Sequence, residues 1–442
     1  MNPELPKETH RIVDKLLKLA IVLGLGMLLY LVIYGRVFQP LLDAALANQW
    51  TRVIARPSTI WISMGALLLA FRTVLLFRYR QATAANLSNA PMLTVIVPAY
   101  NEGPMVGQTI DSIAQADYPR DRLEIFVVDD GSHDDTWEHI DAAARRHPDL
   151  VTPIRFPENR GKRAALEAGL VRARGEFAVT IDSDSVIEPQ TLLELAGPFC
   201  DPKVGAVAGK VAAYNRYNGI IPRMLHVRFV LSFDMLRAVQ STYGTVYCCP
   251  GALAAYRLSV VREVLQRWRQ QTFLGVPCTF GEDRALTNLI LERGLNTVYQ
   301  RNAVVHTVVP ETYIKLAKMF LRWERSYLRE ELRFLTVVLW KRPWRTRWLS
   351  IIDTFFTNLR FPMIYISLGL LVTLAFTNPL IVYRLMAAIG LMAAFYMLYY
   401  LRSEKSMDFL YGIAYAYFSF FTLFWIFPYA VMTPRARSWL TR

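Results

Sequence analysis

Cysteine is scarce in this sequence, with four among 442 residues. Cys200, Cys248, Cys249 and Cys278 form no Cys-x-x-Cys pair and no spacing that is typical of a zinc site. The pattern therefore argues against a disulfide framework and against a zinc centre. It favours reduced cytosolic thiols in packed positions.

Charged residues are also few, at 19 % of the chain, whereas apolar residues make up 53 %. An average soluble domain carries about 25 % charged residues. The 50 basic and 36 acidic residues give a formal net charge of +14. This excess fits basic loops on the cytoplasmic side of a membrane, or a surface that attracts anionic lipid, nucleotide or polymer. No nucleic-acid-binding motif accompanies the charge, so we expect no nucleic-acid partner.

Long apolar runs are confined to the two ends of the chain. Two of them, Leu17–Phe38 and Ile60–Phe77, come before the middle region. The first is long enough to cross a bilayer, has four basic residues at or before its start (Lys7, Arg11, Lys15 and Lys18), and has no small-residue cleavage site after it. These features favour a membrane span with a cytoplasmic N-terminus over a cleaved signal peptide. In the second run, Arg72 would need to reach the membrane surface or find a partner.

Three further runs, Phe355–Phe376, Leu380–Leu401 and Phe409–Met432, close the chain. Together the runs predict a multi-pass protein of the cell (inner or plasma) membrane whose middle region is cytoplasmic. Three final spans would place the C-terminus outside, yet the arginines of the last eight residues favour the cytoplasm. A missed or re-entrant segment within residues 332–360 would reconcile the two.

The middle region has a different pattern. Strand patterns at Leu93–Val97, Leu123–Val128 and Phe177–Ile181 alternate with helix patterns at Gly107–Ala116 and Thr136–Arg146. Such alternation predicts an α/β fold with a mostly parallel sheet covered by helices on both faces. Functional residues are then expected in loops at the carboxyl ends of the strands.

These patterns divide the chain into four segments. They are a membrane region with two transmembrane helices (1–80), a cytosolic α/β domain (81–310), a segment of interfacial helices (311–350) and a C-terminal membrane region (351–442). Residues 220–239 and 313–332 are basic and amphipathic, and each fits either a core-facing helix or an interfacial helix.

Three polar clusters predict a nucleotide-binding site. Pro98-Ala-Tyr-Asn-Glu102 and Asp129-Asp-Gly-Ser132 directly follow predicted strands, where a carboxylate can accept hydrogen bonds from a pyrimidine or a ribose. Asn159-Arg-Gly-Lys-Arg163 supplies two cations, and its glycine permits close approach to a phosphate. Its spacing is not that of a Walker P-loop. Alone, each cluster would also fit a turn, a helix cap or a solvated basic loop.

Two acidic clusters carry the predicted chemistry. Asp182 and Asp184, one residue apart at a strand end, suit a hard cation such as Mg²⁺ or Mn²⁺, which would neutralise charge on a departing nucleotide diphosphate. The carboxylates of Gly281-Glu-Asp283 could serve only the dipole of the helix that follows. A sugar transfer, however, needs a base to take the proton from the acceptor hydroxyl. Asp283 is the candidate for this base, and Glu282 is held in reserve.

In their order and spacing, these motifs resemble the family-2 inverting glycosyltransferases over the whole middle region. The resemblance implies a GT-A-like, Rossmann-related fold and a UDP-sugar donor. Four segments are also similar to hyaluronan synthases and to the chitin-oligosaccharide synthases of nodulation. They are Tyr247–Gly251, Gly281–Asn288, Arg322–Glu330 and Ser438-Trp-Leu-Thr-Arg442. This similarity implies a processive membrane enzyme that elongates a nascent polysaccharide and exports it through its own channel.

The resemblance also implies roles for single residues. Asp129 and Asp130 would contact uridine, in a nucleotide site that also includes Pro98, Tyr100 and Glu102. Lys162 and Arg322 would hold the diphosphate, Asp182 and Asp184 would serve the metal, with Asp184 as the more direct ligand, and Asp182 would also border the nucleotide. Cys249 and Gly251 would border the acceptor site, where Trp323 would stack under the acceptor sugar. Trp439 and Arg442 would belong to a gating segment.

Two residues depart from the family pattern. Met319 stands where the Gln-x-x-Arg-Trp motif has glutamine, and it cannot replace the hydrogen bonds of an amide. Leu440 stands where the terminal Trp-Gly-Thr-Arg motif has glycine. The first departure bears on processivity and donor geometry, and the second bears on the shape of the terminal loop.

The resulting hypothesis is an in-line attack of the acceptor hydroxyl on the anomeric carbon, with inversion. The sugar would be N-acetylglucosamine, alone as in chitin or alternating with glucuronate as in hyaluronan. A non-processive transferase of lipid-linked sugars is the first rival, which Arg322-Trp323 and Cys248-Cys249 disfavour. A membrane receptor with a degenerate transferase domain is the second, which the carboxylates of Asp130, Asp184 and Asp283 disfavour.

Overall fold

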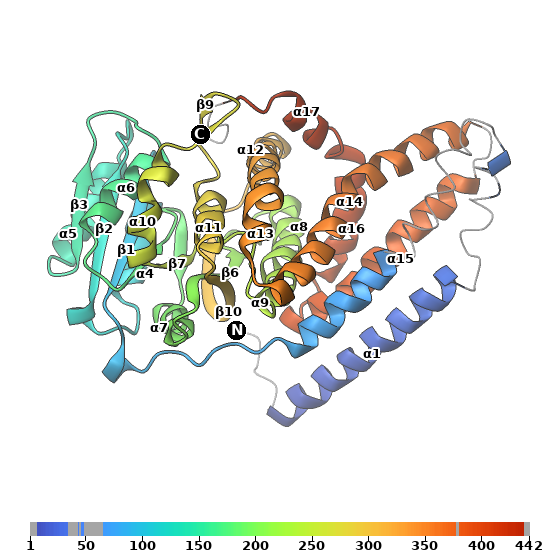
Figure 1. The fold of residues 1–442 in the computed structure, drawn as a ribbon, viewed down its shortest axis with the longest axis horizontal. Coiled ribbons are helices and arrows are strands. Elements are labelled where there is room, and N and C mark those ends of the chain that lie inside the picture. The colour runs from blue at the N-terminus through green and yellow to red at the C-terminus, as the bar shows by residue number, and fades with distance from the viewer. Residues whose placement is uncertain (1–6, 34–42, 44–45, 48–64, 377–379, 437–442) are drawn as a thin grey trace. The chain divides into compact units, whose positions relative to one another are not determined.

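The computed structural model describes residues 7–33, 43, 46–47, 65–376 and 380–436 (Figure 1). The chain divides into two compact units. The first, called here the helical unit, comprises Met1–Phe77 and Ile351–Phe424. The second, called here the sheet unit, comprises Arg78–Ser350 and Trp425–Arg442.

The sheet unit is built on eight strands in the order β3-β2-β1-β4-β7-β6-β10-β5. Their bounds are β1 (Leu93–Ala99), β2 (Leu123–Asp129), β3 (Val151–Arg155), β4 (Phe177–Thr180), β5 (Ser185–Ile187), β6 (Val204–Ala213), β7 (Ala254–Arg257) and β10 (Asn296–Thr307). β3, β2, β1 and β4 are mutually parallel, as are β6 and β10. β7 is antiparallel to β4 and β6, and β5 is antiparallel to β10. The predicted α/β fold is therefore confirmed, with antiparallel pairs that the sequence pattern did not predict.

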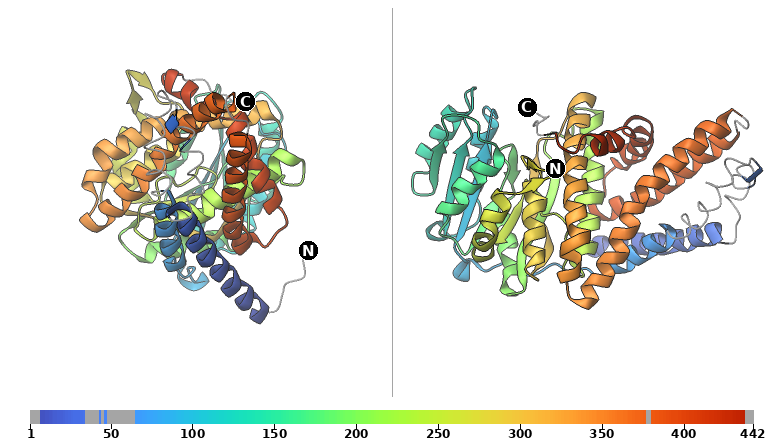
Figure 2. Two further views of the ribbon diagram at one scale, coloured as in Figure 1. Left: turned by 90° about the vertical axis from the view of Figure 1, so that its right-hand side faces the viewer. Right: turned by 45° about the horizontal axis from the view of Figure 1, so that its top comes forward.

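Helices cover the sheet in two layers, as Figures 1 and 2 show. The chain steps from β1 to β2 to β3 in one direction, and the connecting helices α4 (Met105–Ala114) and α5 (Thr136–Arg146) pack against each other. It then returns past β1 to β4 through α6 (Lys162–Arg172), which packs with α10 (Leu258–Arg269), and α10 packs with α11 (Glu282–Glu292). Covered on both sides, β1 and β2 are buried along their whole length.

Both amphipathic stretches form helices interrupted by a π-helical turn or ending in one. The first contains α8 (Ile220–Phe229) and α9 (Leu236–Ser241), and the second is α12 (Tyr313–Arg333). α12 buries Leu316, Met319 and Phe320 and packs against α11 and α17 (Ile426–Met432). One face of α12 thus faces the core. The remaining described elements of this unit are α7 (Thr191–Ala196), α13 (Leu339–Lys341), the hairpin β8 (Thr272–Phe273) and β9 (Val276–Pro277), and short 3-10 turns.

The helical unit contains α1 (Lys7–Ile33), a helix over residues 65–78, most of α14 (Trp344–Ala375), α15 (Leu380–Glu404) and α16 (Phe409–Thr422). α1 lies beside α15 (Figures 1 and 2). The predicted runs fall on these helices, although residues 34–38 and 60–64 lie outside the described residues. The last predicted run is two helices, α16 and α17, rather than one.

Arg72 has the partner that its place in an apolar run requires. Its Nε lies 2.7 Å from Asp353 Oδ1, and both side chains are largely buried. Among the described helices, Leu385–Glu404 is long and apolar enough to cross a membrane. A second span is possible if α16 and α17 together form one bent span. This number is smaller than the five spans that the sequence predicts.

Candidate active site

Five strands of the sheet end at one cavity. β1, β2 and β4 are parallel neighbours, and β6 and β10 run in the same direction because β7 is antiparallel to both β4 and β6. Their carboxyl ends therefore meet at one edge. There they enclose a cavity of about 510 Å³. Its lining includes Pro98, Ala99, Tyr100, Glu102, Asp130, Asn159, Gly161, Lys162, Asp182, Ser183, Asp184, Asn215, Val308, Val309, Pro310, Glu311, Thr312, Lys315, Met319 and Arg322.

Backbone donors hold Asp130 at the cavity wall. Its Oδ1 accepts from the Arg160 N–H and its Oδ2 from the Gly161 N–H, each at 2.8 Å. Burial raises the pKa of Asp130, and the two backbone donors oppose this shift. The loop after β2 is thereby tied to the N-terminus of α6, so two of the three predicted nucleotide clusters lie together.

The loop after β1 is tied to the same region. Asn101 has a left-handed φ of 52°, its N–H donates to Ser132 Oγ at 3.0 Å, and its Oδ1 accepts from His133 N–H at 2.9 Å. Glu102 accepts from Ser183 Oγ at 2.7 Å. A non-glycine residue in this backbone region is uncommon, and such strain concentrates at functional sites.

Lys162 links the cavity to the start of α11. Its ammonium pairs with Asp182 Oδ1, and it lies 3.1 Å from Glu282 Oε1. Burial alone would lower the pKa of Lys162, but the two carboxylates outweigh it and raise the pKa above its usual value. Burial likewise opposes ionisation of Glu282, yet Lys162 lowers the pKa of that carboxyl. Both groups are charged at neutral pH.

Asp283 lies next to this pair in a different electrostatic setting. Its Oδ2 accepts from the Gly251 N–H at 3.3 Å and lies 3.5 Å from Cys248 Sγ. Burial, and then the negative charge of Glu282, raise the pKa of Asp283 above its usual value, although Lys162 opposes them. A carboxylate with a raised pKa is the better proton acceptor near neutral pH.

Asp182 and Asp184 both line the cavity, and the end of β10 holds Asp184 through two hydrogen bonds. Asp184 Oδ1 accepts from Thr307 Oγ1 at 3.1 Å, and its carbonyl accepts from the Val308 N–H at 3.1 Å. Among the described residues, no group of three or more His, Cys, Asp or Glu side chains could hold a metal ion. Two carboxylates fit a hard cation that takes its other ligands from phosphate oxygens and water.

Several predicted site residues lie outside the cavity lining. Asp129 is fully buried, and its Oδ2 lies 3.3 Å from Arg155 Nε. Cys249 is buried, and Trp323 packs against Phe229, Phe233 and Phe320. Gly251 does not line the cavity but lies next to Lys162 and Asp182. Trp439, Leu440 and Arg442 lie outside the described residues.

Arg163 corrects one expectation from the sequence. The sequence counts it as one of two cations in a cluster suited to a phosphate, but its guanidinium is buried and donates to the carbonyl of Trp268 and to Gln271 Oε1. Of the two cations in that cluster, Lys162 is the one that lines the cavity.

Other cavity residues gave no signal in the sequence. Asn215 follows β6, and it joins the segment after β10 through two hydrogen bonds with the backbone of Val309, each of 2.9 Å. Its Nδ2 also lies 2.8 Å from Glu311 Oε1. β6 and β10 were not predicted as strands, so the residues that follow them could not be placed at the site.

The fold is that of a GT-A glycosyltransferase. A mannosyltransferase from Pyrobaculum calidifontis, whose structure holds GDP-Man and Mn²⁺, matches with a TM-score of 0.60 and 24 % identity, over 84 % of this chain and 98 % of that one. At this identity the likeness shows the fold alone.

Sequence comparisons define the family. Residues 94–265 match the glycosyl transferase family 2 model. The chain is 38 % identical to an N-acetylglucosaminyltransferase of Rhizobium meliloti (strain 1021) and 34 % identical to one of Rhizobium leguminosarum bv. viciae, over 62 % and 65 % of its length. It is 33 % identical to a hyaluronan synthase of Streptococcus pyogenes over 63 % of its length. The matches span 66 %, 69 % and 65 % of those relatives. This chain belongs to glycosyltransferase family 2.

Proposed function

We propose that this protein transfers N-acetylglucosamine from a UDP-sugar to the end of a growing polysaccharide, with inversion at the anomeric carbon. The observation that carries the proposal is the cavity at the strand ends. Asp130, Lys162 and Asp184 all line it. Lys162 also pairs with Glu282, the neighbour of Asp283 in the sequence, and this contact joins the cavity to the candidate base. The names of the Rhizobium relatives support this sugar.

In this proposal, Asp130 and the loops after β1 and β2 bind the nucleoside. Lys162 and Arg322 offset the negative charge that grows on the leaving diphosphate. Asp283 takes the proton of the acceptor hydroxyl, because its pKa is raised, whereas Glu282 holds Lys162 in place as its counter-ion. Gly251 leaves room for the acceptor beside these groups.

Asp182 and Asp184 would hold Mg²⁺ or Mn²⁺, which supplies a further positive charge for the diphosphate when bound. The relation to a fold solved with Mn²⁺ supports a divalent metal.

We further propose that synthesis is processive and coupled to export at the cell membrane. The apolar helices of the helical unit would lie in the bilayer, and the sheet unit would face the cytoplasm. The four sequence segments, with boundaries at residues 80, 310 and 350, describe this arrangement.

The enzyme could also use a second sugar. Alternation of N-acetylglucosamine with glucuronate, as in hyaluronan, extends the proposal, and the Streptococcus relative supports it. A chitin-oligosaccharide synthase is the alternative that the Rhizobium names favour, and a non-processive transferase of lipid-linked sugars is the other.

Labelled donors distinguish these forms. Membranes that contain the protein are incubated with each labelled UDP-sugar singly and in pairs, and the product length is measured. Polymer from UDP-N-acetylglucosamine alone indicates the chitin type, and a requirement for UDP-glucuronate as well indicates the hyaluronan type. A single sugar on a lipid contradicts processive synthesis. No incorporation from any donor contradicts the function.

A further inference from the structure

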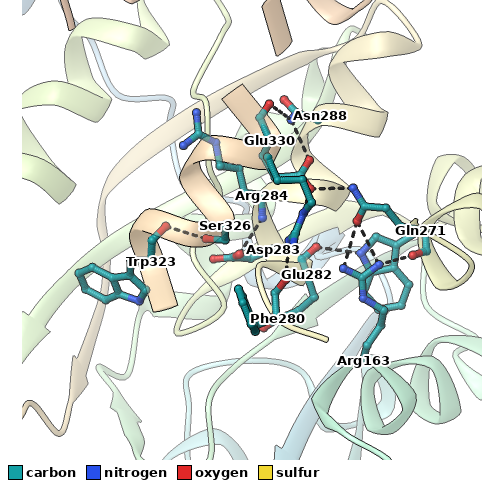
Figure 3. A network of polar contacts seen from close by, with 12 residues as sticks. Arg163, Gln271, Phe280, Glu282, Asp283, Arg284, Asn288, Trp323, Ser326 and Glu330 are labelled. Atoms are coloured by element: carbon teal, nitrogen blue, oxygen red, sulfur yellow. Dashed lines mark hydrogen bonds and ion pairs between the residues drawn. The ribbon is translucent and has the colours of Figure 1, made fainter. Parts of the chain in front are cut away.

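A buried polar cluster lies between α11 and α12, outside the cavity, and joins side chains that Figure 3 shows pointing toward one another. Its centre is the fully buried carboxylate of Glu330. This carboxylate accepts from Arg329 Nε at 2.9 Å, from Gln271 Nε2 at 2.7 Å and from Asn288 Nδ2 at 3.1 Å. A carboxylate removed from water needs such partners, but no step of the proposed reaction uses them.

Arg329 connects this cluster to the turn that carries Asp283. Its Nη2 donates to the carbonyl oxygen of Phe280 at 2.5 Å. On the other side of Gly281, Trp268 Nε1 donates to the carbonyl oxygen of Glu282 at 2.8 Å. The two backbone carbonyls that flank Gly281 are therefore both held by buried side chains.

The turn itself depends on the close approach of α12. Gly281 has a φ of 73°, in the left-handed region that favours glycine. A Cβ at this position would lie 2.5 Å from Ser326 Cβ and 2.8 Å from Arg329 Nη2. α12 therefore packs directly against Gly281, the residue before Glu282 and Asp283.

The same helix reaches the cavity two turns earlier. Arg322 lines the cavity, and Arg329 follows seven residues later, on the same face of α12. One helix therefore carries both Arg322, which lines the cavity, and Arg329, which binds the turn that precedes the candidate base Asp283.

We propose that Arg329 and Glu330 are a positioning pair that fixes the turn Phe280–Asp283 and thereby places the Asp283 carboxylate relative to the cavity. Glu330 orients the guanidinium of Arg329, and Arg329 holds the carbonyl of Phe280. Neither residue touches a reacting atom. The inference rests on the transferase function proposed above, in which Asp283 is the base.

The test is Arg329→Lys, with Arg333→Lys as the matched control. Lysine keeps the charge beside Glu330 but has one nitrogen, so it cannot also donate to Phe280 in the geometry of the guanidinium fork. Arg333 lies on the same helix and pairs with Glu292 at the far end of α11, at 2.7 Å. Because a misplacement of about 1 Å can cost on the order of 100-fold in rate, we expect Arg329→Lys to lower kcat by about 10- to 100-fold with an unchanged donor KM. Arg333→Lys should leave kcat within about threefold of wild type.

Hydrogen exchange of the peptide 279–284 gives a readout that does not depend on activity. The proposal predicts slow exchange in the full-length wild-type protein, faster exchange in Arg329→Lys and no change in Arg333→Lys. If Arg329→Lys melts below the assay temperature, Glu330→Gln replaces it, with the same expectations. Exchange in the wild-type turn as fast as at the exposed residues 158 and 159 overturns the proposal. An equal fall of kcat in Arg333→Lys also overturns it. So does an Arg329→Lys variant whose donor KM changes while its kcat does not.

The two proposals can fail separately. If wild-type protein transfers no sugar from any UDP-sugar, the proposed function fails, and the exchange measurement still decides whether Arg329 holds the turn. If transfer is normal in Arg329→Lys and the exchange is unchanged, the positioning role fails while the function stands.

Discussion

Glu282 and Asp283 are neighbours in the sequence, yet the structure shifts their pKa values in opposite directions. Glu282 faces Lys162, which lowers its pKa despite its burial. Asp283 faces the Gly251 N–H and Cys248, and burial together with the charge of Glu282 raises its pKa. From the sequence alone, Asp283 is the candidate base and Glu282 is the reserve. The contact of Glu282 with Lys162 is what favours Asp283.

This difference predicts a pH dependence. A base acts when deprotonated, so kcat/KM falls as the pH drops through the pKa of Asp283, above the usual range for aspartate near 3.9. Glu282→Gln removes the negative charge that helps to raise this pKa, so the acid limb of the pH–rate profile should move to lower pH. The kcat/KM profiles of wild type and Glu282→Gln are measured at donor concentrations well below KM. A limb that stays in place, or moves to higher pH, contradicts the assignment.

Gly251 tests how tightly the groups around Lys162 are placed. A Cβ on Gly251 would lie 2.9 Å from Lys162 Nζ and 3.4 Å from Asp182 Oδ1. Gly251→Ala must therefore shift an ammonium that two carboxylates hold, and we expect the donor KM to rise about tenfold, or about 1.4 kcal/mol. Gly219→Ala is the control, since its Cβ would meet nothing closer than 3.8 Å. Equal KM values for the two variants would refute this account of Gly251.

At the scale of elements, strands with continuous apolar residues could be predicted and others could not. β1, β2 and β4 were found because Val, Ile, Leu and Phe dominate them. β6 is rich in Gly and Ala, and β10 contains polar residues and a register shift between Gln300 and Val304, so neither resembled a strand. The contact of Gln271 with Glu330 joins positions 59 residues apart and leaves no local pattern.

The end of α11 carries a second cluster that links elements. Glu292 pairs with Arg267 of α10, Arg333 of α12 and Lys341 of α13, at 3.1, 2.7 and 2.8 Å. Burial opposes its ionisation, but hydrogen bonds from the three cations lower the pKa of Glu292 to about 2. The helix dipole disfavours a glutamate at a helix C-terminus, and the three cations offset this unfavourable interaction.

Glu292→Gln should therefore lower the stability of the protein, by about 2 kcal/mol, because three charge-assisted bonds lose their acceptor charge. The folded pKa lies below the ordinary value near 4.5, so this contribution is fully present above that value and is lost as the pH falls toward 2. Thermal melts of both proteins between pH 7 and 3 measure it. The gap between the two melting temperatures should narrow on acidification, and a gap that is constant or widens would count against the assignment.

At the scale of the whole molecule, the order of motifs predicted the α/β class and the family. The five apolar runs predicted a multi-pass membrane protein, and the described helices that carry them give one or two candidate spans by length and composition. The buried pair of Arg72 and Asp353 shows how a charge inside an apolar run is neutralised by a partner 281 residues away, which a local sequence pattern cannot identify.

The central claim is that this chain is a sugar transferase whose base is Asp283. The most direct measurement is UDP release by the full-length protein in lipid vesicles, with UDP-N-acetylglucosamine as donor, in wild type and Asp283→Asn. UDP binding is measured on both proteins. The account predicts release by wild type, a loss of about 100-fold or more in Asp283→Asn and retained UDP binding. Near-normal release by Asp283→Asn, or no release by wild type from any UDP-sugar, would contradict it.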